Sequence, residues 1–290
     1  MNILVTGGSG FIGSHVVDKL IEAGHKVRVL DIRKPHHRED LEFYEGNITS
    51  QKAVKESLLG MDIVYHIAAF SNINLVKANP LLTIKYNIMG TACLLEECRK
   101  RGLKRFVLAS SIYVSSRRGH LYTTAKFASE RICQDYYTLY SLPYTILRYG
   151  TAYGPRSRMV DVVSTFVAKA LRGKNLLIYG SGEQKRNFIY VEDLALGTVA
   201  ALKLAAENQT YILAPERAVS IRELAETVRS IFGEKISIEY HPAREDDYQG
   251  EIISAARAKK EFGLEPKVSL EEGIKKYIEW YQALERKETK

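Results

Sequence analysis

Short apolar runs alternate with longer helical patterns along the first half of the chain. The apolar runs predict six buried strands: NILVT, KVRVLD, LEFYEG, DIVYHIA, KRFVLAS and YTILRY. Helical patterns lie between them at residues 11–23, 51–59, 80–101 and 122–140. Such regular alternation is typical of βαβ units. The sequence therefore predicts an α/β fold, a doubly wound parallel sheet with helices on both faces.

The regular alternation of strand and helix patterns ends after about residue 152. Helical patterns follow at 159–172, 192–206, 220–232 and 269–285, linked by short strands near 176–179, 210–213 and 236–240. Ser220-x-x-Glu223 and Ser269-x-x-Glu272 have the spacing of capping boxes, which satisfy free N–H groups at a helix start. We expect a second, smaller α/β region with no flexible linker before it.

One helix of the first half has clear boundary signals. Asn79-Pro80 predicts its start, a cap followed by proline at the first helical position. Gly102, after three basic residues, predicts its end.

Composition places the chain among ordinary globular proteins. Its 290 residues, 46% apolar and 26% charged, suffice for one large domain or a large domain with a smaller companion. The cysteines at 93, 98 and 133 lack C-x-x-C spacing and are odd in number, so we interpret them as reduced packing residues.

No apolar run approaches the ~18 residues of a membrane span, and the first residues do not resemble a secretion signal. We expect a cytoplasmic protein without a membrane partner.

The formal net charge of +8 does not by itself indicate a nucleic-acid partner. Acidic and basic residues are interspersed, and no basic stripe carries interleaved aromatics. We interpret the clusters at 33–38 and 117–120 as solvated loops rather than polyanion sites. A small anionic ligand is compatible with this charge.

A glycine-rich segment, TGGSGFIGSHVVDKL, follows the first strand directly. Gly7, Gly10 and Gly13, with Gly8 giving a second match to G-x-G-x-x-G, can turn the chain tightly and let the backbone approach a pyrophosphate. The helix that begins there points its free N–H groups at the anion. A purely structural glycine turn is the alternative.

Asp31 favours the binding of a dinucleotide over that alternative. It ends the next strand, 18 residues beyond Gly13, where an acid can hold the ribose 2′-hydroxyl of NAD. Because a carboxylate repels a 2′-phosphate, the sequence predicts NAD rather than NADP, although Arg33 and Lys34 could accept such a phosphate.

Tyr122 and Lys126 form a second candidate group with the serines at 110 and 111. A spacing of four places the phenol and the ammonium on one helix face. In isolation the pair would be ordinary surface residues. Its position after a complete cofactor loop favours a catalytic role.

Taken in order, the glycine loop, Asp31, HIAA at 66–69, the serine pair and Tyr122-x-x-x-Lys126 resemble the extended short-chain dehydrogenases/reductases. More closely, the chain is similar to the nucleotide-sugar epimerases typified by UDP-glucose 4-epimerase. Three later segments extend the resemblance over almost the whole chain: YGPR at 153–156, LLIYGSGEQKRNFIYVEDLA at 176–195 and AARAKKEFGLEPKVSLEEGI at 255–274.

The resemblance implies a catalytic set of Ser111, Tyr122 and Lys126. Tyr122 would be the general acid/base, Lys126 would bind the nicotinamide ribose and lower the Tyr122 pKa, and Ser111 would hydrogen-bond the reacting hydroxyl. Such help is needed because a free phenol, with a pKa near ~10, is a poor base at neutral pH. Tyr113 is a rival phenol but has no lysine four residues later.

The resemblance also implies the cofactor contacts. GNI at 46–48 matches an adenine-contacting segment in which Asn47 replaces the usual Asp, and its amide oxygen could still accept from the adenine amino group. Asn87 would brace the site and Tyr149 would flank the nicotinamide. The expected cofactor-binding residues are Gly7, Gly10, Phe11, Ile12, Gly13, Asp31, Ile32, Arg33, Asn47, Ile48, Ala68, Ala69, Asn87, Tyr122, Lys126 and Tyr149.

On the substrate side, the resemblance implies Ser111, Thr151, Arg186 and Arg244. The two arginines match residues that grip the substrate diphosphate, for which a forked donor is well suited. Thr151 stands where relatives often have an asparagine, and only residues 112–121 separate Ser111 from Tyr122, where relatives usually have a longer loop. Both departures affect the sugar pocket. No cluster has the spacing of metal ligands, so we expect no metal.

The predicted function is NAD-dependent epimerisation of a nucleotide-diphosphate sugar, most simply UDP-glucose/UDP-galactose at C4 through a 4-keto intermediate. Ile112-Tyr113 stands where 4,6-dehydratases carry an acid pair, which disfavours elimination and also makes a decarboxylase less favoured. Two alternatives stay open: a dehydrogenase or reductase of a non-nucleotide alcohol, and a non-catalytic dinucleotide-binding protein.

The domain and assembly predictions follow the resemblance. We expect residues 1–152 with 186–206 to form the dinucleotide-binding domain, and 153–185 with 207–290 the substrate-binding domain. The helices at 80–101 and 122–140 resemble those of a four-helix dimer interface, which predicts a homodimer.

Overall fold

The structure is a computed structural model that describes all of residues 1–290 except 116–119, 159, 234, 244–253 and 289–290. The chain divides into two compact units. The first contains Met1–Tyr149, Ala195–Leu213 and Arg257–Leu264, and the second contains Gly150–Leu194, Ala214–Ala256 and Glu265–Lys290.

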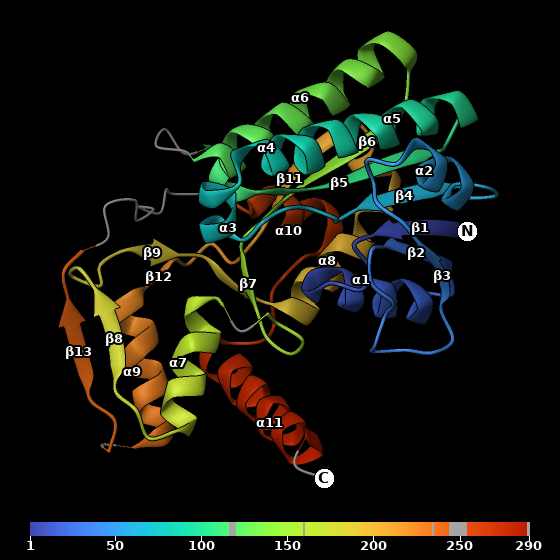
Figure 1. Cartoon of the computed structure of the whole chain (residues 1–290). Coiled ribbons are helices and arrows are strands. Elements are labelled where there is room, and N and C mark those ends of the chain that lie inside the picture. The colour runs from blue at the N-terminus through green and yellow to red at the C-terminus, as the bar shows by residue number, and fades with distance from the viewer. Residues whose placement is uncertain (116–119, 159, 234, 244–253, 289–290) are drawn as a thin grey trace. The chain divides into compact units, whose positions relative to one another are not determined.

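A seven-stranded sheet forms the centre of the first unit, with strand order β11-β6-β5-β4-β1-β2-β3 (Figure 1). All neighbouring strands in it are parallel. The strands are β1 (Asn2–Thr6), β2 (Lys26–Asp31), β3 (Glu42–Glu45), β4 (Ile63–His66), β5 (Arg105–Ser111), β6 (Tyr144–Tyr149) and β11 (Gln209–Leu213). The chain winds outward from β1 in both directions, which confirms the predicted doubly wound fold. Ligands of such sheets bind at the carboxyl edge, where the winding reverses.

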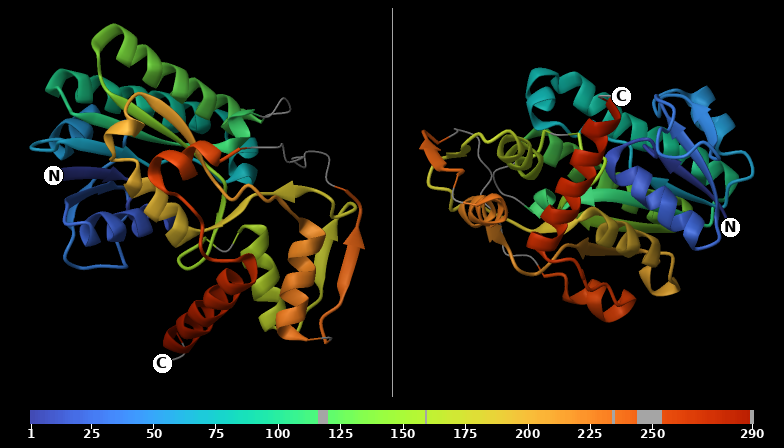
Figure 2. Two further views of the ribbon diagram at one scale, coloured as in Figure 1. Left: turned by 180° about the vertical axis from the view of Figure 1, so that it is seen from behind. Right: turned by 90° about the horizontal axis from the view of Figure 1, so that it is seen from below.

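Helices cover both faces of this sheet; α5 and α6 lie on one face and α1 on the other (Figure 1, Figure 2). The core against α5 and α6 includes Leu4, Phe106, Leu95, Cys98 and Cys133. The helical elements are α1 (Phe11–Glu22), α2 (Gln51–Ser57), α3 (Ile73–Ala78), α4 (Pro80–Thr83), the π-helix η1 (Ile84–Met89), α5 (Gly90–Arg101), the 3₁₀ turn η2 (Ile112–Ser115), α6 (Leu121–Tyr140), α8 (Val191–Ala200), the 3₁₀ turn η3 (Leu204–Ala206) and α10 (Ala256–Phe262).

The helix predicted over 80–101 is present but not uniform. Pro80 occupies its first turn and Gly102 ends it with a left-handed φ of 62°, as predicted. Asn79, however, makes no side-chain cap and donates instead to Leu75 O. The middle of the segment, Ile84–Met89, is a π-helix, a form often found at functional sites.

The second half of the chain departs from the predicted boundaries in two places. The strand near 210–213 pairs with β6 and becomes an edge strand of the large sheet, because its buried Tyr211 and Leu213 continue that sheet's core. The helix predicted over 192–206 ends at Ala200. The two units also differ from the predicted domains, because residues 207–213 and 257–264 belong to the first unit and residues 150–152 and 186–194 belong to the second.

The described part of the second unit contains helices and short strand pairs. Its helices are α7 (Val162–Leu171), α9 (Ile221–Phe232) and α11 (Leu270–Glu288). Ser220 and Ser269 cap α9 and α11 by accepting from the N–H groups of Glu223 and Glu272, as predicted. The strand pairs are β7 (Thr151–Tyr153) with β10 (Phe188–Tyr190), β8 (Leu176–Tyr179) with β13 (Ile238–His241), and β9 (Lys185–Arg186) with β12 (Val219–Ser220).

Candidate active site

The glycine loop between β1 and α1 is packed so closely that only backbone fits. A Cβ placed on Gly13 would lie 2.1 Å from Gly7 O, and one on Gly7 would lie 2.7 Å from Ala68 N. Gly7 also has a left-handed φ of 75°, which glycine adopts without strain. Gly8 serves packing instead, since a Cβ there would lie 2.8 Å from both Val29 methyl groups.

The first turn of α1 is suited to an anion. It begins at Phe11, continues through Ile12 and Gly13, carries no acidic residue, and its N-cap Gly10 makes no side-chain cap. The N–H groups of a first helical turn have no partner within the helix, so they can bind a phosphate. The loop and helix therefore fit the pyrophosphate of a dinucleotide.

Asp31 is held next to this loop at the end of β2. Its Oδ2 accepts from Ser9 N at 3.1 Å and its Oδ1 from Arg33 N at 3.2 Å, while Ser9 Oγ donates to Arg33 O at 2.6 Å. Each carboxylate oxygen has a second lone pair with which it can accept from a ribose hydroxyl. Ile32 and Arg33 are exposed beside it.

Asn47 and Ile48 follow β3 and are engaged within the protein. The Asn47 amide oxygen accepts from both Thr49 N at 3.0 Å and Thr49 Oγ1 at 2.9 Å, so the acceptor expected to face adenine is used locally. The Ile48 side chain is buried against Gly90, on which a Cβ would lie 2.6 Å from Ile48 Cδ1.

A chain of buried hydrogen bonds joins β1, β4 and α5 at the same edge. Thr6 Oγ1 lies 2.8 Å from His66 Nδ1, and His66 Nε2 lies 2.9 Å from Thr91 Oγ1. Since Thr91 Oγ1 itself donates to Asn87 O, the Nε2 of His66 carries the proton. Burial, and to a lesser extent the charge of Lys126, lowers the pKa of His66 to about 3. His66 is therefore a neutral link in this chain.

Asn87 lies in the π-helix and fixes the segment after β4, which contains Ala68 and Ala69. Its side chain accepts from Phe70 N at 2.7 Å and donates to Phe70 O at 3.0 Å. Its carbonyl accepts from Ser129 Oγ of α6 at 2.7 Å. Asn87 thus connects the end of β4 with the middle of α6.

The two serines at the end of β5 have different partners. Ser110 Oγ donates to the buried Glu130 carboxylate at 2.5 Å, whereas Ser111 Oγ accepts from Tyr113 N at 3.3 Å. Ser110 therefore belongs to the packing between β5 and α6. Ser111 stays the candidate for contact with a substrate.

Lys126 is an interior residue of the site rather than a surface one. Only 4% of it is exposed, and its Nζ donates to Ala109 O at 2.7 Å, two residues before Ser111. Tyr122 lies one helical turn earlier on α6, half-buried, with its ring 5.9 Å from that of His120. The structure thus brings Lys126 to the strand that ends in Ser111.

Burial shifts the pKa values of both residues toward their neutral forms. It raises the pKa of Tyr122 well above 10.0, with a smaller contribution from Tyr113. It lowers the pKa of Lys126 to about 8, an effect that Glu130 opposes. The expected lowering of the Tyr122 pKa by Lys126 does not outweigh burial, so a phenolate here needs further positive charge.

The lowered pKa of Lys126 has a measurable consequence for stability. Above pH 8 the folded chain releases this proton while the unfolded chain holds it up to about 10.5, so folding becomes more favourable as the pH rises through that window. We expect the unfolding free energy of the wild type, relative to Lys126→Met, to increase by on the order of 2 kcal/mol from pH 7 to pH 10. Guanidinium denaturation of both proteins at matched pH measures this difference, and a pH-independent difference would exclude the shifted pKa.

Tyr149 ends β6 beside Ser111, its partner in the strand register. Its ring is buried, its hydroxyl accepts from Thr198 Oγ1 at 3.0 Å, and burial raises its pKa above 10.0. The hydroxyl is therefore held by α8 within the first unit.

Apart from Ser111, the predicted substrate residues that the structure describes, Thr151 and Arg186, lie in the second unit. Thr151 begins β7 and its N–H donates to Asn187 O at 2.9 Å. Arg186 lies in β9 and its Nη1 donates to Lys185 O. Arg244 lies outside the described residues.

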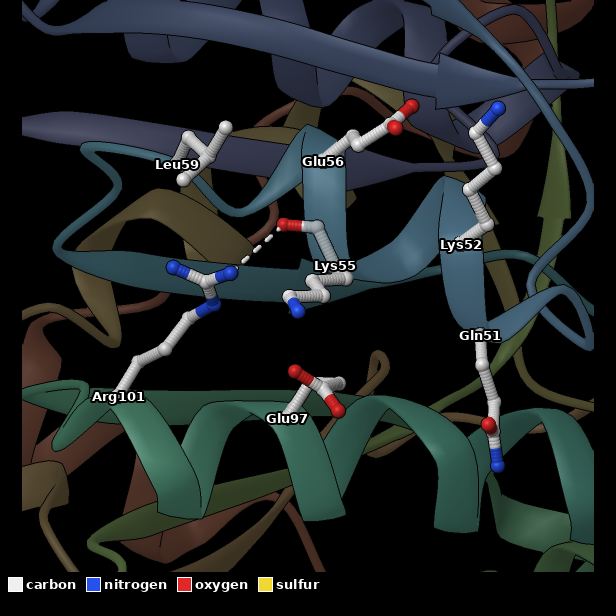
Figure 3. Close-up of a pocket in the computed structure, with 7 residues that line it drawn as sticks. All are labelled: Gln51, Lys52, Lys55, Glu56, Leu59, Glu97 and Arg101. Atoms are coloured by element: carbon white, nitrogen blue, oxygen red, sulfur yellow. Dashed lines mark hydrogen bonds between the residues drawn. The ribbon is translucent and has the colours of Figure 1, made fainter.

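A separate cavity of about 490 Å³ opens between α2 and α5 (Figure 3). Its lining residues are Gln51, Lys52, Lys55, Glu56, Leu59, Glu97 and Arg101. Arg101 Nη2 donates across it to Lys55 O at 2.9 Å. None of the predicted site residues lines this cavity.

Among the residues that the structure describes, no three His, Cys, Asp or Glu side chains gather as a metal site would require. Within those same ranges, no helix has both the length and the apolar character of a membrane span.

Ser9 and Glu130 contribute to the site but were not identified from sequence. Ser9 is one of the variable positions of the glycine motif, and its role appears only when β2 is placed beside the loop. Glu130 had a usable signal, since it lies four residues after Lys126 and eight after Tyr122 on one helix face.

Known proteins resemble this chain in sequence and in fold. Residues 3–214 match the model of the NAD dependent epimerase/dehydratase family. UDP-glucuronic acid decarboxylase 1 of Arabidopsis thaliana is 33% identical over 96% of this chain and 69% of its own length. Among solved structures, UDP-glucose 4-epimerase of Thermotoga maritima with UDP-glucose is 34% identical with a TM-score of 0.92, covering 98% of this chain and 99% of that one. UDP-glucuronic acid 4-epimerase of Bacillus cereus, in complex with UDP-glucuronic acid and NAD, is 26% identical with a TM-score of 0.90, covering 98% and 100%.

Proposed function

The chain belongs to the NAD-dependent epimerase/dehydratase family, and from that premise we propose that it inverts C4 of a UDP-hexose, with UDP-glucose/UDP-galactose as the leading substrates. Its cofactor is NAD. The observation that carries the proposal is the buried Lys126, bound to the strand that ends in Ser111 and one helical turn from Tyr122. A buried ammonium one helical turn from a phenol is suited to proton transfer, because its charge favours the phenolate.

The first unit would hold NAD through the residues described above. The first-turn amides of α1 would bind the pyrophosphate, Asp31 the ribose hydroxyls, and the segment at Ala68 and Ala69 would line the cofactor. When bound, NAD supplies the hydride acceptor and donor that the sugar carbon needs.

Side chains of the protein would transfer the proton of the C4 hydroxyl. Tyr122 Oη would take the proton from the C4 hydroxyl and later return it, while Ser111 Oγ donates a hydrogen bond to the same oxygen. Lys126 would bind the nicotinamide ribose and favour the phenolate by its charge. The sugar would pass through a 4-keto form, and turning over within the pocket before the hydride returns would invert C4.

In the second unit, we propose that Arg186 and Arg244 bind the diphosphate and that Thr151 contacts the sugar. An arginine presents forked donors to phosphate oxygens, which would anchor the nucleotide while the sugar turns. The support for these roles is the match of their segments to the nucleotide-sugar epimerases.

A UDP-glucuronic acid decarboxylase is the second candidate, because the Arabidopsis relative bears that name. The residues Ile112-Tyr113 disfavour a decarboxylase. The similar proteins nevertheless include both decarboxylases and 4-epimerases. Both share the oxidation at C4, so the catalytic roles of Ser111, Tyr122 and Lys126 would be unchanged.

The test is a substrate panel without added NAD. The purified protein is denatured to release and identify any bound cofactor, and the native protein is offered UDP-glucose, UDP-galactose, their N-acetyl forms and UDP-glucuronic acid. NMR should show C4 inversion of one of the first two. Inversion of only an N-acetyl form or of UDP-glucuronic acid would reassign the sugar, CO₂ release from UDP-glucuronic acid would establish the decarboxylase, and turnover of a simple alcohol alone would establish a dehydrogenase.

We also propose that the chain is a cytoplasmic homodimer. Large apolar side chains are exposed on adjoining elements: Leu81 on α4, Ile84 and Met89 on η1, and Phe127 and Tyr137 on α6. Such a patch is typical of a subunit interface. Light scattering should then give twice the chain mass of 32.8 kDa, and a single-chain mass would refute the dimer.

A further inference from the structure

The buried side chains of Ser110 and Glu130 and the partly buried side chain of Arg148 connect β5, α6 and β6. The Glu130 carboxylate accepts from Arg148 Nε at 3.0 Å and Nη2 at 2.7 Å, and Ser110 Oγ donates to it at 2.5 Å. The Glu130 side chain is 3% exposed and that of Arg148 is 26% exposed. This two-point ion pair, with its third hydrogen bond, satisfies a charge that would otherwise be costly to bury.

This cluster adjoins Lys126 through both elements that position it. Glu130 lies four residues after Lys126 on the buried face of α6. Ser110 lies next to Ala109, whose carbonyl accepts from Lys126 Nζ, and is followed by Ser111. The cluster therefore fixes the strand end from one side and the helix from the other.

The titratable groups near Lys126 lie on three elements: Glu130 and Tyr122, each one helical turn away on α6, the neutral His66 on β4, and Arg148 on β6 through its ion pair with Glu130. Glu130 is the negative charge that favours the ammonium. Because Arg148 is a cation paired with Glu130, we expect its charge to oppose that of the carboxylate at Lys126.

We propose that Glu130, held by Arg148 and Ser110, is a positioning residue that fixes the strand end carrying Ala109 and Ser111 and places a carboxylate one helical turn from Lys126 on the buried face of α6. The inference rests on the proposed function, in which a charged Lys126 supports proton transfer at Tyr122. It assigns a role to a buried acid that lies outside the candidate catalytic set of Ser111, Tyr122 and Lys126. Burial alone would favour a neutral amine at Lys126, so the carboxylate maintains the charge near physiological pH.

The experiment follows the titration of Lys126 directly, without substrate. Protein labelled with ¹³C at lysine Cε is titrated by NMR in the form in which it is purified, and Lys126→Met assigns the resonance. Glu130→Gln, which keeps the shape and removes the charge, should lower the midpoint by about one pH unit, a tenfold change in the ionisation constant. Arg148→Gln should move the midpoint in the opposite direction.

Ser110→Ala is the matched control, because it removes one hydrogen bond to Glu130 without changing any charge. Its midpoint should stay with that of the wild type. If Glu130 had only a structural role, the Lys126 midpoints of Glu130→Gln and Arg148→Gln would equal that of the wild type or would both shift in the same direction. Either result overturns the proposal. If Glu130→Gln does not fold, Arg148→Gln decides alone, since an unchanged or lowered midpoint in that variant contradicts the proposal.

The pH profile of kcat is the second readout. In Glu130→Gln, activity should be lost on the alkaline side at a pH about one unit lower than in the wild type, in step with the NMR midpoint. Shifted NMR midpoints with an unshifted kcat profile would overturn the catalytic part of the proposal. Because the NMR titration needs no turnover, it still decides the role of Glu130 if every sugar nucleotide fails as a substrate.

Discussion

Replacing Tyr122 by Phe is expected to lower kcat by about 10³-fold while the protein stays folded, since a positioned acid/base contributes about 10² to 10⁴. The substitution removes only the hydroxyl. The ring that lies 5.9 Å from His120 remains, so the start of α6 keeps its packing. Initial rates on the substrate that the panel identifies, together with circular dichroism and the melting temperature, measure the effect.

Tyr113→Phe is the matched control for that variant. Tyr113 lies in η2 and makes a minor contribution to the raised pKa of Tyr122, but it has no lysine one helical turn later. Its loss should change kcat by less than about tenfold. If the two variants have equal activity, or if Tyr122→Phe keeps wild-type activity, the assignment of Tyr122 is wrong.

Replacing Gly13 by Ala should abolish stable binding of NAD. The added methyl would lie 2.1 Å from Gly7 O, which is backbone and cannot rotate away. Either α1 moves off the loop or the loop opens, and both displace the first-turn amides from the pyrophosphate. We expect the variant to purify without NAD, with binding at least about 10²-fold weaker because more than ~2.7 kcal/mol of contacts is lost.

Gly60→Ala controls for the general cost of replacing a glycine. Gly60 has a left-handed φ of 74° with open space at its Cβ, so alanine there costs about 1 kcal/mol of stability without a clash. This variant should retain NAD. Retention of NAD by Gly13→Ala, measured by release and absorbance, would show that the loop does not hold the pyrophosphate.

The elements of the first unit could be predicted from sequence because their signals are local. Buried parallel strands are continuous apolar runs, and Gly102 and the two serine caps act on neighbouring residues. Features set by long-range contacts were missed. The strand at 209–213 looked like part of the second region, and only its pairing with β6 assigns it to the large sheet.

In the candidate site too, local signals could be predicted from sequence and long-range contacts could not. Spacing within one helix located Tyr122 and Lys126, and the glycine motif located the loop. The roles of Ser9 and Glu130 depend on contacts with residues 18 or more positions away in the chain, at Asp31, Ser110 and Arg148, so spacing along a helix could mark Glu130 as a candidate but could not give its partners. Asn47 differs, because Thr49, only two residues later, takes the oxygen expected to face adenine.

The fate of the hydrogen on C4 of the sugar shows whether it leaves as a hydride or is exchanged with water as a proton. The substrate that the panel identifies is prepared with deuterium at C4 and converted in ordinary water, and the product is examined by NMR and mass spectrometry. Our account predicts that deuterium stays on C4, because the hydrogen leaves and returns as a hydride held within the protein while Tyr122 exchanges only the hydroxyl proton. Replacement of that deuterium by solvent hydrogen would contradict it.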